Sequence, residues 1–165
     1  MTKYVYLIAQ LPALAYDKPS YMNVSMFLEE ANKWMSKRDL EKLKNVSFKD
    51  SEVDEKHSKT LRIVQQFGKQ IRQDLGQWRQ SKKKGAEYKP ESFPVSIVKE
   101  GNPLEIEKKL LYLRWQFIES MELDHHFDLD LLMLYFLKLQ ILQKLSEYNK
   151  DKGMERFQQI SKVIE

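Results

Sequence analysis

Residues 103–149 read PLEIEKKLLYLRWQFIESMELDHHFDLDLLMLYFLKLQILQKLSEYN, and the predicted fold is built around these residues. It opens with Asn102, Pro103 and Glu105, which are a helix cap, a proline at the first helical position and a first-turn acid. The predicted helix is heavily apolar through LLYLRWQFI and runs to about Leu123. After ELDHHF, Asp128 caps a second helix that is apolar nearly all round, and a helix of that kind is central. The stretch therefore predicts an αα-hairpin at the centre of the hydrophobic core.

Further segments also place apolar residues at helical spacing. One predicted helix follows an Asn23 cap through Met35, and a short one follows Ser36 through Lys44. A long one, with a narrow apolar stripe, runs over roughly 52–80, and a last one begins at about Asp151. The tryptophans sit on apolar stripes, so core packing is predicted for Trp34, Trp78 and Trp115.

Composition agrees with long helices. The 165 residues are 42% hydrophobic and 32% charged, contain only five glycines and five prolines, and lack cysteine, which rules out disulfides and thiolate chemistry. We expect an all-α fold, a multi-helix bundle of about six helices in a single helical domain over 1–165. Two lobes, 1–80 and 100–165, are predicted to be joined by a linker over 81–99 that is rich in Lys, Pro and Gly.

The segment YVYLIAQLPAL, residues 4–14, carries no charge. Its uninterrupted apolar run ends at Ala9 and Pro12 follows, so it is too short for a typical signal peptide or a membrane span. A short buried strand and a short buried helix both fit so brief a run, because periodicity cannot separate them. The sequence leaves open whether the chain's own core or a partner covers this segment.

Acidic residues and two histidines gather in ELDHHFDLD, residues 122–130. Glu122, His125 and His126 are candidate metal ligands, since carboxylate and imidazole bind zinc, iron and manganese, and Glu-x-x-His occurs in di-iron bundles. No second Glu-x-x-His is present. The structural reading is stronger, because Asp128 serves as a helix cap and His125 complements a helix C-terminus. No metal or other cofactor is therefore expected.

A basic run with nearby aromatic residues follows the long helix. Nucleic-acid binders typically contact phosphates through lysine and arginine and stack aromatic rings on the bases. The net charge of +4, however, is low for that class. We therefore favour a solvated or protein-docking segment over a nucleic-acid site. The residues concerned are Arg79, Lys82, Lys83, Lys84 and Lys89, with Trp78 and Tyr88.

Sequence motifs for nucleophilic or nucleotide chemistry are missing. The chain has no Gly-x-Ser-x-Gly elbow, no phosphate-binding loop of the form Gly-x-x-x-x-Gly-Lys and no Gly-x-Gly-x-x-Gly. Nucleophilic catalysis and nucleotide binding by these routes therefore have no support in the sequence.

Two parts of the chain together resemble a bacterial family of unknown function. They are YVYLIAQLPAL with FLEE soon after it, and YLRWQFIESME with FDLDLLMLYFLKLQIL and DKGMERF. Members of that family are usually encoded among genes for V/A-type rotary ATPases. There they stand in for the all-helical component that couples the rotor shaft to the membrane ring. The resemblance implies a non-catalytic subunit or accessory factor, cytoplasmic and held at the inner face of the membrane through stalk or rotor proteins.

On this reading, the opening segment and the basic run are the expected partner contacts. A metal-binding bundle centred on Glu122, His125 and His126, or a nucleic-acid module using 79–89, remains the alternative. The contact residues predicted are Tyr4, Tyr6, Leu7, Leu11, Leu14, Lys82, Lys83 and Lys84.

Overall fold

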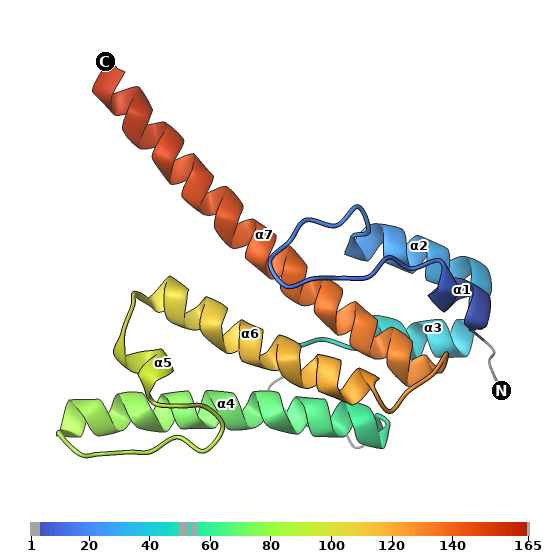
Figure 1. Ribbon diagram of the computed structural model, residues 1–165, viewed down its shortest axis with the longest axis horizontal. Helices are drawn as coiled ribbons and strands as arrows, with labels where there is room; N and C mark the ends of the chain where they lie inside the picture. The colour runs from blue at the N-terminus through green and yellow to red at the C-terminus, as the bar shows by residue number, and fades with distance from the viewer. Residues whose placement is uncertain (1–3, 50–52, 54–55, 165) are drawn as a thin grey trace.

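The computed structural model describes residues 4–49, 53 and 56–164, and all regular secondary structure in those residues is helical (Figure 1). The all-α prediction is therefore confirmed. The helices are α1 (Val5–Ala9), α2 (Val24–Trp34), α3 (Lys37–Lys44), α4 (Lys59–Lys84), α5 (Ser96–Lys99), α6 (Pro103–Glu122) and α7 (Leu129–Ile164).

The predicted hairpin of α6 and α7 is the centre of the molecule. The two helices pack along each other, α4 packs against α6, and α2 and α3 pack against α7 (Figure 1). The main core lies between them and contains Trp115 and a run of buried leucines on α7. Residues of both predicted lobes meet in this core, since Leu61 and Val64 of α4 belong to the same cluster as Leu111 of α6.

A second, smaller core lies between α4, α5 and α6. Its buried members are Ile71, Phe93, Val98 and Leu110. The chain after α4 folds back along that helix to reach this core (Figure 1). The predicted linker 81–99 therefore includes the last turn of α4 and all of α5.

Side-chain caps begin most helices where the sequence places them. Asn23 accepts a hydrogen bond from the Met26 N–H at 2.8 Å, and Asn102 accepts one from the Glu105 N–H at 2.9 Å. Ser36 and Asp128 cap α3 and α7 in the same way. Each cap satisfies one backbone donor that the first helical turn leaves without a partner.

The predicted boundaries of two helices are wrong. The long helix begins at Lys59 rather than near Glu52, because Ser58 takes the cap position and accepts from the Leu61 N–H, and it ends only at Gly85, whose φ of 70° is left-handed. The separate helix predicted from Asp151 is instead the continuation of α7, since a single glycine costs too little to end a helix that is already formed.

The far end of α7 extends beyond the other helices. In Figure 1 the C-terminal part of its ribbon projects away from the body as a single rod. In the described part of the chain, no helix is long and apolar enough to cross a membrane.

Candidate protein-docking surface

The opening segment forms the one-and-a-half-turn helix α1, which resolves the choice between strand and helix. Tyr4 and Leu7 share one face and are buried, with 4% and 0% of their surface exposed, whereas Tyr6 points outward and is 75% exposed. The Tyr4 hydroxyl donates to the Asp39 carboxylate of α3. Burial, and then this carboxylate, raise the pKa of Tyr4 to about 12. One face of α1 is thus core and the other is open.

Tyr6 is paired with an aromatic residue of α2. Its ring stacks on that of Trp34, with the centroids 6.0 Å apart and the planes 24° from parallel. Trp34 is 50% exposed, so the prediction that it packs in the core is wrong. It is the last residue of α2, and the chain turns to an extended conformation at Met35, so no later helical turn covers the ring. We call Tyr6 and Trp34 the aromatic pair.

The rest of the opening segment lies along the hairpin. Leu11 and Leu14 are half-buried against the main core. The Pro12 carbonyl accepts a hydrogen bond from the Tyr135 hydroxyl of α7 at 2.7 Å. Of the five predicted contact residues in this segment, Tyr6 alone presents a mostly exposed side chain.

The predicted lysine contacts lie at the other end of the molecule. Lys82, Lys83 and Lys84 form the exposed last turn of α4, at the opposite end of the structure from α1 (Figure 1). The structure therefore does not join the aromatic pair and the lysines into one surface.

The aromatic residues of the basic run are used within the fold. Trp78 packs against the smaller core, and Lys82 Nζ lies 4.3 Å from the centroid of its ring. The Tyr88 hydroxyl donates to Asp74 at 2.7 Å. Stacking on nucleic-acid bases would require both rings to leave these contacts.

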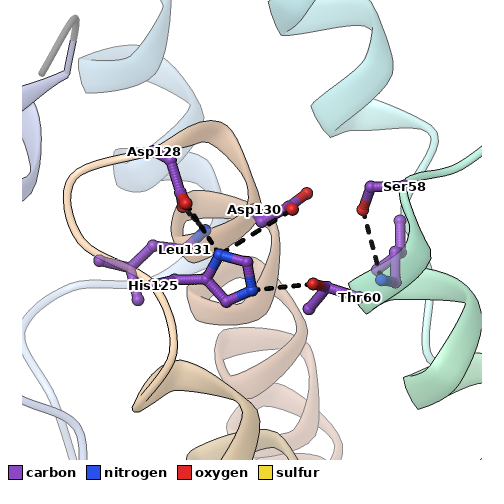
Figure 2. Close-up of polar contacts among 7 residues, drawn as sticks. Ser58, Thr60, His125, Asp128, Asp130 and Leu131 are labelled. Carbon is purple, nitrogen blue, oxygen red and sulfur yellow. Dashed lines mark hydrogen bonds and ion pairs between the residues drawn. The ribbon is translucent and has the colours of Figure 1, made fainter. Parts of the chain in front are cut away.

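His125 joins the hairpin turn to the start of α4 (Figure 2). Its Nε2 lies 2.8 Å from the Thr60 hydroxyl, and its Nδ1 lies 2.8 Å from an Asp128 carboxylate oxygen and 4.0 Å from one of Asp130. The order of hydroxyl, imidazole and carboxylate is that of an activated nucleophile. Because these contacts join the turn between α6 and α7 to α4, the arrangement acts as a clamp between helices.

The other two candidate metal ligands point to different surroundings. Glu122 pairs with the buried Lys138 of α7 at 2.9 Å, and burial raises the pKa of Glu122 despite that lysine. His126 is exposed. Among the residues that the structure describes, no group of three or more His, Asp or Glu side chains is placed to hold a metal ion.

An open groove lies beside the first half of α2. It occupies about 790 Å³ between the 17–25 segment with the start of α2 and the middle of α7. Its apolar lining includes Met22, Val24, Leu28, Leu139 and Leu142.

Sequence reasoning missed several charged residues that the structure places in or near the cores, including three on α4 and α6. Asp74 on α4 is fully buried, and Arg72 and Arg114 are half-buried between α4 and α6. Two of these three interrupt an apolar pattern, Asp74 between Ile71 and Leu75 and Arg114 within LLYLRWQFI. A charged residue inside an apolar pattern was the sequence signal that could have identified them.

Comparison with known proteins adds a family without an assigned role. A family model described as "Protein of unknown function (DUF2764)" matches residues 90–165, which include α5, α6 and α7. The chain is similar to that family over this segment. No curated protein and no solved structure matches it.

Proposed function

We propose that this protein is a non-catalytic subunit or accessory factor of a V/A-type rotary ATPase and acts as a helical docking protein. Its partners would be stalk or rotor proteins, through which it would be held at the inner face of the membrane. The resemblance of YVYLIAQLPAL and of the hairpin sequence to the family encoded with those ATPases supports the assembly.

The aromatic pair is the observation that carries the docking role. Tyr6 on α1 and Trp34 at the end of α2 are large, exposed and stacked, and the opposite face of α1 is buried in the core. Tyrosine and tryptophan are enriched among the residues that dominate binding energy at protein interfaces. A rigid pair of this kind loses little conformational entropy when a partner covers it.

A pull-down tests the proposal. The tagged protein is recovered from membranes of its own host after mild detergent, and the bound proteins are identified by mass spectrometry. We expect components of the rotary ATPase with the unaltered protein. Tyr6→Ala or Trp34→Ala should lower their recovery by about tenfold or more, since truncating a central anchor costs about 2 kcal/mol or more.

Tyr21→Ala is the matched control. Tyr21 is 68% exposed but lies before the other end of α2, so its removal should leave recovery unchanged. Circular dichroism checks that each variant keeps its helices. If the unaltered protein recovers no part of the ATPase, the assembly proposal fails. If Tyr6→Ala and Trp34→Ala recover as much as Tyr21→Ala, the aromatic pair is not the contact.

A further inference from the structure

Two arginines from different helices converge on one backbone oxygen. The Phe48 carbonyl accepts hydrogen bonds from Arg72 Nη2 of α4 at 3.1 Å and from Arg114 Nη2 of α6 at 2.5 Å. Both side chains are half-buried, so they are withdrawn from bulk water without being sealed from it. The two guanidinium groups therefore lie close together around the same oxygen atom.

Their positive charge is not balanced within the described residues. None of the ion pairs formed there includes Arg72 or Arg114. Arg72 Nη1 is buried and has no hydrogen-bond acceptor. Burial, and then the neighbouring Arg72, lower the pKa of Arg114 to about 10, against the opposite effect of Glu107. Buried like charges are costly unless an anion accompanies them.

The backbone of α4 makes room for one of these groups. A Cβ at Gly68 would lie 2.8 Å from Arg114 Nη2 and 3.1 Å from its Cζ. Glycine within a helix costs about 1 kcal/mol relative to alanine, and here its missing side chain lets the guanidinium lie against the helix. The position of Arg114 is therefore set by the fold.

We propose that Arg72 and Arg114 form a binding site for a small oxyanion, a phosphate or a carboxylate group. The planar guanidinium fork matches both groups with two parallel hydrogen bonds, and an oxyanion would supply the acceptor that Arg72 Nη1 lacks. The site is independent of the assembly role proposed above, because it uses neither the aromatic pair nor α1.

Isothermal titration of the full chain tests the site. Inorganic phosphate and acetate are titrated separately, with sodium chloride holding the ionic strength constant. We expect saturable binding of at least one of them. Arg72→Gln, Arg114→Met and Gly68→Ala should each weaken it by about tenfold or more, since a hydrogen bond to a charged group contributes about that factor.

Two variants serve as controls. Gly76→Ala makes the same change on the same helix where nothing lies within 4 Å of the new Cβ, and Arg79→Gln removes an exposed arginine of α4. Both should bind like the unaltered chain. If Arg114→Met fails to fold, as judged by circular dichroism, Arg72→Gln and Gly68→Ala still decide the matter.

Three results would overturn the proposal. The first is no saturable binding of either anion, and the second is binding that survives Arg72→Gln and Gly68→Ala undiminished. The third involves the acidic residues that follow Phe48 in the sequence. If neutralising these acidic residues creates phosphate binding that the unaltered chain lacks, the chain's own carboxylates, and not an external anion, neutralise the two arginines. That variant combines Asp50→Asn, Glu52→Gln, Asp54→Asn and Glu55→Gln.

Discussion

The buried carboxylate of Asp74 fixes the segment that follows α4. It accepts hydrogen bonds from the Ser92 N–H at 2.8 Å, the Ser92 hydroxyl at 2.6 Å, the Glu91 N–H at 3.1 Å and the Tyr88 hydroxyl at 2.7 Å. Burial by itself would raise the pKa of Asp74, but these hydrogen bonds and one from Gln70 outweigh it, and the pKa lies below its usual range. The folded state therefore prefers the ionised form.

Asp74→Asn should destabilise the protein by about 1–3 kcal/mol at pH 7, because an amide cannot replace a carboxylate that accepts on both oxygens. Since the folded pKa is depressed, this contribution is complete above the unfolded pKa of about 4 and disappears as pH falls through the folded value. Urea unfolding at several pH values measures it. The difference in free energy of unfolding between the unaltered and Asp74→Asn proteins should shrink below about pH 4.

The exposed Asp124 provides the control for this experiment. Asp124→Asn should change the free energy of unfolding by no more than about 0.5 kcal/mol. A gap between the Asp74→Asn and unaltered proteins that stays constant down to about pH 2 would show that the ionised carboxylate is not what holds the segment.

At the scale of helices, α4 contains two interior glycines with different surroundings. A Cβ at Gly76 meets nothing within 4 Å, so Gly76→Ala should stabilise the protein by about 1 kcal/mol through helix propensity alone. Thermal unfolding should show a rise of roughly 2–4 °C for a domain of this size. Gly68→Ala should raise the stability less than Gly76→Ala does, because the new Cβ displaces Arg114. A lower unfolding midpoint for Gly76→Ala would contradict the prediction.

Local chemistry explains which helix boundaries the sequence can predict. Asn23, Ser36, Asn102 and Asp128 act through residues close in the chain, so the sequence identifies them as caps. The start of α4 escapes prediction, since the polar residues before Ser58 resemble a first helical turn. The short α1 cannot be assigned from sequence because its conformation depends on burial against α2 and α3, which lie further along the chain.

The candidate sites depend still more on tertiary contacts. The sequence predicts Tyr6 as a contact but places Trp34 in the core. Helical spacing puts Trp34 on the apolar stripe, but it does not show that the helix ends there and leaves the ring uncovered. Arg72 and Arg114 are 42 positions apart in the sequence, and they come together only through the packing of α4 on α6. Such pairings follow from packing and cannot be read from spacing.

For the whole molecule, the projecting end of α7 should add helix content but little to the free energy of unfolding. A chain that ends at Lys150 retains the helices that pack together in Figure 1. We expect its free energy of unfolding to stay within about 0.5 kcal/mol of the full chain's, because the ribbon of this end stands apart from the other helices in Figure 1 and truncation is tolerated at such positions. Urea unfolding measures this free energy, and far-ultraviolet circular dichroism measures the helix content lost. A loss of stability above about 2 kcal/mol would mean that the end of α7 packs on the body.

The hydrogen bond between Tyr135 and the Pro12 carbonyl has a consequence for biosynthesis. It joins residues 123 positions apart, and the opening segment reaches its place only when α7 exists. During translation, Tyr4 to Leu14 leave the ribosome long before the helix that covers them, at about 5–20 residues each second. For that interval this uncharged, largely apolar stretch lacks its native contacts with α7. The nascent chain should therefore depend on ribosome-associated chaperones more than its small size suggests.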